Sequence, residues 1–420
     1  MRLVTPRGGG VDTIRPVTGT SVRATRGWVV SRIRRITFAR ARTLTTVPMS
    51  RKGRPEADAA PLPPLYAMTH AGVEPVAADE ITRDLGGEVK KTTRGLVVFR
   101  VKELTPDLLK LRTTEDVYLL AWGSDSLAFT ADDLNLIRTW TARKPDWQRL
   151  FKLHHSLRPK TKGRPTFNLV VQMQGEHGYR RSDAKEAFAE GLAGVIPAGW
   201  QRSDENAWLE IWLTIRGKVA TCGVRLSDRT MRHLTYKMDH VLASLRPSAA
   251  AAMVRLAGVG PGMTVLDPMC GGGTILAEAV DLARSRRGDP IRVIGGDIDP
   301  NAVFVSSQNL ENVGKADLFR WDATALPLAS GSVDRIVSNP PFGKQLASLD
   351  EIGPLYVAAA REWDRVLKPG GRAVLLVMEF DALQPPLRSR RWALTRQLKV
   401  RLLGQPCILS AWEKPDWVGG

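Results

Sequence analysis

The chain reads DPMCGGGT from Asp267 to Thr274, between the apolar strand pattern Thr264–Leu266 and the helical pattern Thr274–Ala283. Glycine lets the backbone turn sharply and approach a ligand, and the first N–H groups of the helix face whatever lies on the turn. A nucleotide-like ligand is therefore expected here. The motif alone is weakly specific, because its spacing departs from the dinucleotide pattern G-x-G-x-x-G and a glycine-rich tight turn also fits it.

Strand and helix patterns alternate on both sides of this motif. The strand patterns lie at Arg292–Gly296, Asp334–Val337 and Arg372–Val377, and the helical patterns at Pro247–Leu256, Asn301–Asn309 and Leu355–Leu367. Such alternation predicts an α/β fold with a doubly wound, mostly parallel sheet of the Rossmann-like type. We assign this domain to residues 244–420.

Acidic residues follow the next two expected strands. Asp297 ends the first of them within the sequence GGDID, where folds of this type hydrogen-bond a ribose. Asp322 follows the second of them, which is the third expected strand of the domain in chain order, and a carboxylate there could accept from an adenine amine. Each acid alone could be a solvated loop residue or a helix cap. Together with Asp267 they stand at three successive strand ends, which favours a cofactor site.

The strand pattern Asp334–Val337 leads to the sequence NPPFG, residues Asn339–Gly343. Pro340 and Pro341 stiffen the backbone and keep Asn339 out of helical geometry, so its side chain can be aimed at one point. An amide oxygen there can accept the hydrogens of a planar amino group, and Phe342 offers a face for a base that has left its helix. A Pro-Pro turn with a packed Phe is the alternative if the motif is taken alone.

Together these motifs and SLRPSAA at Ser244–Ala250 resemble class I S-adenosylmethionine (AdoMet)-dependent methyltransferases of the amino-methylating type. Among these they resemble the THUMP-domain guanine-N2 RNA methyltransferases, over about residues 236–380. The resemblance implies methylation of the exocyclic N2 amine of a guanosine in structured RNA, with tRNA expected. It implies a catalytic group of Asn339, Pro340, Pro341 and Phe342. It implies AdoMet contacts from Arg246, Pro247, Asp267, Pro268, Cys270, Gly271, Gly273, Asp297, Asp322 and Asn339.

Upstream, short strand and helix patterns predict an α+β region. We expect a ferredoxin-like domain at 61–142, a THUMP RNA-binding domain at 143–228 and a linker at 229–243. Residues 143–164 hold eight Lys or Arg and one acid, Asp146. Such a run can be a solvated face, but the resemblance favours phosphate contacts. The expected RNA-binding residues are Lys152, Arg158, Lys160, Lys162, Arg164, Arg180 and Arg181.

The net charge of the 420 residues is +18, but much of it lies in the first 55 residues, which hold 13 Lys and Arg and a single acid. We expect residues 1–60 to be a basic disordered tail, a transit peptide or a mis-annotated start before Met49. Three scattered cysteines fit no disulfide framework or Cys-type zinc site, and His154 and His155 lack partners at metal-ligand spacing. A cytoplasmic monomer without a metal or a membrane segment is expected.

Two classes of alternative stay open. The same chemistry could serve a guanine of ribosomal RNA, a DNA adenine or a protein glutamine, since each presents an amino or amide nitrogen. The sequence shows no base-reading module for DNA. The second class is a non-catalytic RNA-binding protein with a degenerate transferase domain, and the intact glycines and acids at every cofactor position argue against it.

Overall fold

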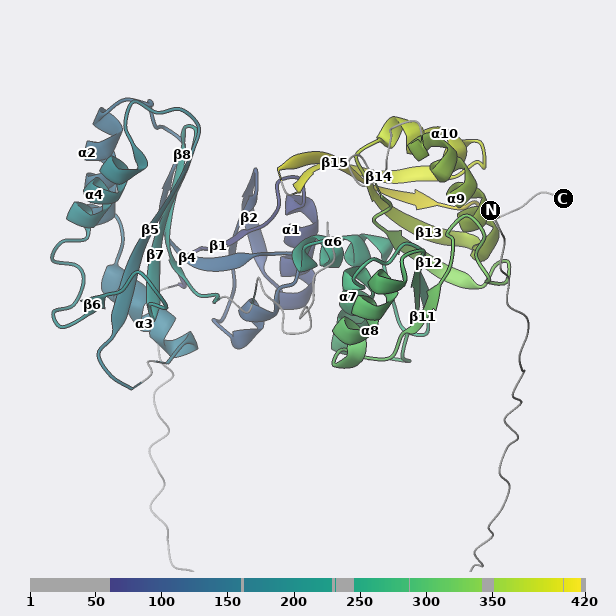
Figure 1. Cartoon of the computed structure of the whole chain (residues 1–420). Coiled ribbons are helices and arrows are strands. Elements are labelled where there is room, and N and C mark those ends of the chain that lie inside the picture. Colours follow the sequence, from purple (N-terminus) through teal and green to yellow (C-terminus); the bar gives the residue numbers. More distant parts are fainter. Residues whose placement is uncertain are drawn as a thin grey trace, which may run out of the picture. The chain divides into compact units, whose positions relative to one another are not determined.

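The computed structural model describes residues 61–159, 162–228, 231, 245–286, 288–341, 351–402 and 404–416. The expected tail 1–60, most of the expected linker, Lys160 and Phe342 lie outside these residues. The described chain forms two sheets, of eight and seven strands (Figure 1). No helix within the described ranges is long and apolar enough to cross a membrane.

The first sheet has the strand order β2-β3-β1-β4-β8-β7-β5-β6. Its strands are β1 (Leu65–Met68), β2 (Glu88–Thr93), β3 (Leu96–Arg100), β4 (Asp116–Ser124), β5 (Thr166–Gln174), β6 (Gln201–Arg202), β7 (Leu209–Arg216) and β8 (Val219–Arg225). The helices are α1 (Glu74–Leu85), the 3-10 helix η1 (Pro106–Lys110), α2 (Asp132–Arg143), α3 (Trp147–Leu157) and α4 (Arg181–Gly191). Strand β2 was not predicted, since it is a largely exposed edge strand without an apolar face.

The sheet continues across residue 143, where the sequence suggested a domain boundary. Strand β4 pairs antiparallel with β8, with Tyr118 opposite Arg225. Helix α2, which precedes the boundary, packs on α4, which follows it. The division into a ferredoxin-like domain and a THUMP domain stays a prediction.

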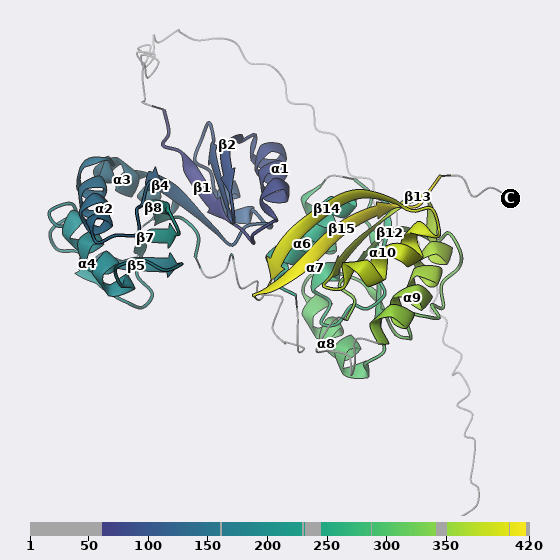
Figure 2. The ribbon, with the colours of Figure 1, turned by 90° about the horizontal axis from the view of Figure 1, so that it is seen from above.

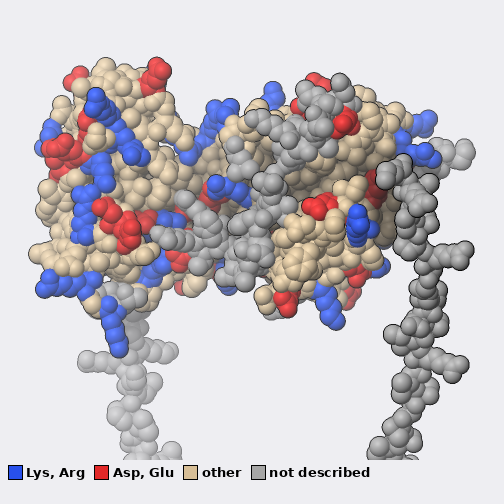
Figure 3. Space-filling view, in the orientation of Figure 1, with Lys and Arg blue, Asp and Glu red and all other residues tan. Residues whose placement is uncertain are grey.

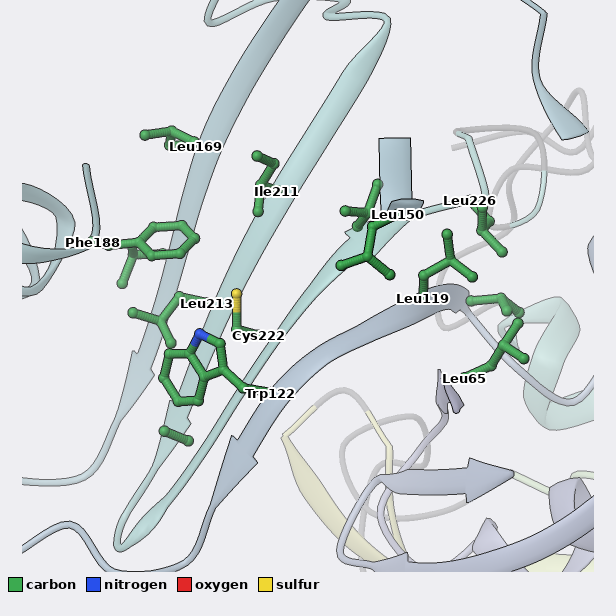
Figure 4. Packing of buried hydrophobic residues seen from close by; sticks show 14 of the residues in the cluster. Leu65, Leu119, Trp122, Leu150, Leu169, Phe188, Ile211, Leu213, Cys222 and Leu226 are labelled. Carbon is green, nitrogen blue, oxygen red and sulfur yellow. The ribbon is translucent and has the colours of Figure 1, made fainter. Parts of the chain in front are cut away.

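One hydrophobic core lies on both sides of this boundary. Figure 4 shows Trp122 of β4 beside Leu213 of β7 and Cys222 of β8, with Phe188 of α4 close to Leu213. All four side chains are buried. Burying a large apolar side chain stabilises the fold by about 1.5–3 kcal/mol, so segments far apart in sequence depend on one another here.

The second sheet has the strand order β11-β10-β9-β12-β13-β15-β14. Its strands are β9 (Thr264–Asp267), β10 (Arg292–Asp297), β11 (Asp317–Arg320), β12 (Val333–Ser338), β13 (Leu367–Val377), β14 (Ala393–Leu402) and β15 (Gln405–Glu413). Strands β9 to β13 are parallel, and β15 is antiparallel to both β13 and β14. The expected mostly parallel, doubly wound sheet is confirmed, whereas the closing hairpin β14–β15 was not predicted.

Helices cover both faces of this sheet. They are α6 (Pro247–Ala257), α7 (Thr274–Ser285), α8 (Pro300–Glu311), α9 (Ile352–Val366) and α10 (Phe380–Arg388). Figure 2 shows α6, α7 and α8 on one side of the sheet and α9 and α10 on the other. One apolar cluster joins the first three helices to the sheet, and a second joins the other two. Because β11, β10, β9 and β12 are parallel neighbours, the segments after their carboxyl ends meet at one edge of the sheet.

Candidate active site

The turn between β9 and α7 carries the glycine motif. Gly271 and Gly273 have φ values of +50° and +74°, a backbone region that favours glycine. A Cβ on Gly273 would lie 2.9 Å from Ser306 Oγ of α8, whereas a Cβ on Gly271 would meet no described atom within 4 Å. Gly273 therefore serves close packing on α8, and Gly271 leaves open space beside the turn.

Polar side chains of α8 hold the same turn from behind. Ser306 Oγ donates to the Gly271 carbonyl at 2.6 Å, and Asn309 Nδ2 donates to the Gly272 carbonyl at 2.9 Å. Both side chains are buried. The sequence interpretation missed them, although two polar residues at i and i+3 on a buried helix face were a usable signal.

Asp267 joins the glycine turn to the segment after β12. Its Oδ1 accepts from Ser338 Oγ at 2.8 Å and from the Met269 N–H at 3.3 Å. Its side chain is only 1% exposed, and burial raises its pKa to about 7, with the charge of Asp297 adding to the shift. Ser338 was not predicted, yet it is the direct link between the two motifs.

Asp297 and Asp322 lie where the sequence placed them: Asp297 is the last residue of β10, and Asp322 follows β11. Asp297 Oδ2 accepts from the Gly271 N–H at 2.9 Å, so this carboxylate also holds the glycine turn. Asp322 is exposed and accepts from the N–H and Oγ1 of Thr324 at 2.8 and 2.7 Å. Trp321 donates its ring N–H to the Pro268 carbonyl at 2.9 Å, which links the segment after β11 to the segment after β9.

Asn339 directly follows β12, one strand away from the glycine turn. Its Oδ1 is buried and has no hydrogen-bond partner among the described residues. An unsatisfied buried acceptor is costly, which makes it a position where a donor is expected. Pro340 is buried, and the Tyr356 hydroxyl of α9 donates to the Pro341 carbonyl at 3.3 Å, so the turn is fixed to α9. Phe342 lies outside the described residues.

Arg246 and Pro247 form the N-terminus of α6. Arg372, near the start of the parallel part of β13, donates to the Leu256 carbonyl at the other end of this helix. The N-terminus of α6 therefore points toward the carboxyl edge of the sheet. Arg246 is half exposed, with Nη1 3.4 Å from Glu115 Oε1.

Glu115 is a further residue that the sequence interpretation missed. It accepts from Ser248 Oγ at 3.1 Å, and His70 Nε2 lies 3.2 Å from the same carboxylate. Burial opposes ionisation here, but His70, Arg246 and Ser248 outweigh it and lower the pKa of Glu115 to about 2. This cluster fixes the start of α6 to the segment before β4.

Cys270 is buried in the glycine turn, with Sγ 3.5 Å from Ser306 Oγ. Burial, with the charge of Asp267 adding to it, raises the pKa of this thiol well above its usual range. A thiol held neutral in this way is a poor nucleophile, and the expected contact of Cys270 with AdoMet stays a prediction.

The expected RNA-binding residues lie around the second half of the first sheet. Lys152, Lys162, Arg164, Arg180 and Arg181 are exposed, whereas Arg158 pairs with Asp228 at 2.9 Å and donates to the Leu226 carbonyl. Figure 3 shows Lys and Arg interspersed with Asp and Glu on the visible face. A role in RNA binding stays a prediction for all of these residues, and Lys160 lies outside the described part.

The two histidines of the basic stretch differ in environment. His154 is buried against the edge of Trp208, and burial, with nearby Arg158, lowers its pKa to about 3. His155 is exposed and touches the same indole. Within the described ranges, no three His, Cys, Asp or Glu side chains come together as a metal site.

The strand order and the turns at the carboxyl edge are those of a class I methyltransferase, for which AdoMet is the methyl donor. Residues 235–406 match the family model of the RMKL-like methyltransferase domain. The crystal structure of TrmN from Thermus thermophilus has a TM-score of 0.68 and 26% identity, covering 84% of this chain and 99% of that one.

Curated relatives agree with this class. The tRNA (guanine(6)-N2)-methyltransferase of Thermus thermophilus is 28% identical over 332 residues, which is 78% of this chain and 91% of that protein. The human U6 snRNA (guanine-N(2))-methyltransferase THUMPD2 is 31% identical over 217 residues, 51% of this chain. The match spans 41% of the human protein, so less than half of its length has a counterpart here.

Proposed function

We propose that this protein methylates the exocyclic N2 amine of a guanosine in structured RNA, with tRNA as its substrate. The observation that carries the proposal is the buried Oδ1 of Asn339, which has no hydrogen-bond partner among the described residues and belongs to the residue after Ser338, the donor to Asp267 at the start of the glycine motif. A guanine amino group is planar and carries two donors, and an acceptor held at this point would orient one of them. The Thermus relative, which this chain covers almost completely, is named for this chemistry at nucleotide 6 of tRNA, and we propose the same nucleotide.

The protein residues have a limited task in this reaction. Bound AdoMet would supply a methyl group on a sulfonium, which needs no metal or covalent nucleophile to activate it. The glycine turn and Asp297 would hold the donor, and Asn339 would align the acceptor nitrogen and draw its lone pair out of conjugation with the ring. Alignment of two reactants can account for a large part of a rate enhancement. The rigid Pro340-Pro341 turn, fixed by Tyr356, keeps this alignment.

The remaining expectations belong to the same proposal. We propose that the first sheet and its helices bind the RNA, that the active protein is a monomer without a metal, and that it works in the cytoplasm. U6 snRNA and ribosomal RNA are the competing substrates. A protein that binds RNA without methylating it is the second candidate, and it would fail to bind AdoMet.

The test is Asn339→Ala, with the exposed Asn312→Ala at the end of α8 as the matched control. Asn339→Ala should cut turnover at least about a hundredfold and leave AdoMet affinity nearly unchanged, because the lost acceptor acts on the target base. Turnover is measured by nucleoside mass spectrometry on transcripts of tRNA, U6 snRNA and ribosomal RNA, and AdoMet affinity by calorimetry. Equal turnover of both variants would remove Asn339 from this role.

A further inference from the structure

A cavity of about 660 Å³ lies beside the carboxyl edge of the second sheet. Its walls come from the start of α1, the turn between β2 and β3, the end of β13 and the hairpin β14–β15. This volume is in the range of sites for small molecules and nucleotide-sized groups. None of the motifs discussed above contributes to it.

The cavity reaches the neighbourhood of Asn339 through the strand register. Ser338 of β12 is opposite Leu375 of β13, so Asn339 follows β12 at the same edge of the sheet where Met378, which lines the cavity, follows β13. Adjacent strands are roughly 4.8 Å apart. The row continues from Val377 to Ile408 on β15, and from Ile408 to Lys399 on β14. The lining residues Met378, Ile408 and Lys399 therefore belong to the three strands that follow β12 in the sheet, so the cavity lies within about three strand spacings of the strand that leads to Asn339.

The cavity is basic. Its lining includes Arg94, Lys399 and Arg401, all exposed, and within the described chain none of the three forms an ion pair. Arg401 Nη1 donates to the Gly404 carbonyl at 2.9 Å. Glu74 is the single acid among the described lining residues, and it is buried. Its two carboxylate oxygens accept from the backbone N–H groups of Gly72 and Gly95, so both oxygens are used to hold the backbone.

The shape of the cavity depends on a close backbone approach. Gly72 has a φ of +95°, and a Cβ there would lie 2.0 Å from the Lys399 carbonyl oxygen. The Arg401 N–H donates to the Ala71 carbonyl at 3.0 Å. The segment before α1 thus covers part of the edge strand β14, while Lys399 and Arg401 are exposed and are among the residues that line the cavity.

We propose that this cavity binds the sugar-phosphate backbone of the nucleotides that flank the methylated guanosine. This rests on the proposed function, since it names a second contact region for the same RNA. A base that contacts Asn339 leaves its flanking nucleotides at the same edge of the sheet. Three cations that form no ion pair with the described residues, together with Thr92 and Thr93, suit phosphate groups. The contacts are to the backbone, so they hold the RNA without reading its sequence.

The experiment compares Lys399→Gln/Arg401→Gln with a control that removes the same charge, Lys315→Gln/Arg396→Gln. Lys315 and Arg396 are exposed and do not line the cavity, and Arg396 lies on the same edge strand. Binding of an unmodified tRNA transcript is measured at several salt concentrations. Removing one cation from a phosphate reduces the salt slope by about one, so the first double variant should have a slope smaller by about two and bind about tenfold more weakly. AdoMet affinity and turnover at saturating tRNA should not change.

A protection assay on the unaltered full chain gives an independent reading. Lysine acylation, followed by mass spectrometry, should show that tRNA protects Lys399 while Lys315 stays reactive. Equal tRNA affinity of the two double variants, or acylation of Lys399 at the same rate with and without tRNA, would overturn the proposal and leave the cations a role in protecting an edge strand. These readouts measure binding of tRNA. A failure of the unaltered protein to methylate guanosine would therefore contradict the proposed function and not the proposal that the cavity binds RNA.

Discussion

The buried carboxylate of Asp267 connects two parts of the site and, at neutral pH, lowers the stability of the fold. It joins the end of β9 to Ser338, and burial raises its pKa to about 7, far above its value in an unfolded chain. Between pH 4 and 7 the folded protein therefore holds a proton here that the unfolded chain has released. Under that linkage, stability falls as pH rises through this window, and the loss is complete above pH 7.

We predict that Asp267→Asn removes this pH dependence. An amide keeps an acceptor for Ser338 and Met269 but has no charge to desolvate. The stability of the variant relative to the wild-type protein should rise by up to about 1.4 kcal/mol per pH unit between pH 4 and 7. Above pH 7 this difference should stay constant. Urea unfolding of both proteins at pH 5 and pH 8, without AdoMet, measures this.

Asp334→Asn is the matched control for this prediction. Burial opposes the ionisation of Asp334, but Lys368 and the Thr264 N–H outweigh it and lower its pKa. Its ionised form therefore stabilises the fold at neutral pH. The control Asp334→Asn should be less stable than the wild-type protein, whereas Asp267→Asn should be more stable. A stability difference for Asp267→Asn that is the same at pH 5 and pH 8 would contradict the prediction.

At the scale of the element, the glycine turn shows two different reasons for the same residue type. Gly273 lies against Ser306 of α8, while Gly271 faces open space next to the site. The sequence could not separate these reasons, because both glycines have positive φ values and both stand in one run. The difference depends on the packing of α8 behind the turn.

We predict that Gly273→Ala lowers the melting temperature more than Gly331→Ala does. Gly331 has a φ of +61° with no described atom within 4 Å of an added Cβ, so that variant reports the backbone strain alone. Backbone strain of this kind costs about 1–3 kcal/mol, and Gly273→Ala adds a 2.9 Å contact with Ser306 Oγ. Differential scanning calorimetry compares the two, and equal melting temperatures would show that the turn shifts without cost.

At the scale of the whole described chain, buried ion pairs connect the α+β region to the methyltransferase domain. Arg112, just after η1, donates to both carboxylate oxygens of Glu278 on α7 at 3.1 and 2.6 Å. Arg255 of α6 pairs with Glu80 of α1 at 2.8 Å. Glu80 and Glu278 are almost fully buried, so each needs its cation in place.

We predict that Arg112→Ala destabilises the protein by about 3–5 kcal/mol, because it leaves the buried Glu278 without this bidentate partner. Arg138→Ala, which breaks a half-exposed pair with Glu190, should cost less than about 1 kcal/mol. Urea unfolding of both variants gives the comparison. A loss for Arg112→Ala no larger than that for Arg138→Ala would mean that the junction does not depend on this pair.

Local sequence was enough for the alternating strands and helices around the glycine turn and for the order of the motifs. The glycine run, the acids after two strands and the Asn-Pro-Pro turn predicted the sheet type and the edge where the site lies, because parallel strands bring their carboxyl ends together. Side chains that act through neighbours distant in sequence were not predictable in this way. Ser338 on Asp267, Tyr356 on Pro341 and Glu115 on Ser248 have no local pattern.

The antiparallel hairpin and the basic cavity likewise had no signature in the sequence. Arg94 and Lys399 are about 300 residues apart, and only the pairing of β14 with β15 and the approach of Gly72 bring them to one wall. Periodicity and turn chemistry are properties of neighbouring residues, so the chain itself carries them. Burial, shared hydrogen bonds and the grouping of unpaired charges arise when distant segments pack, and for this reason the folded molecule alone reveals them.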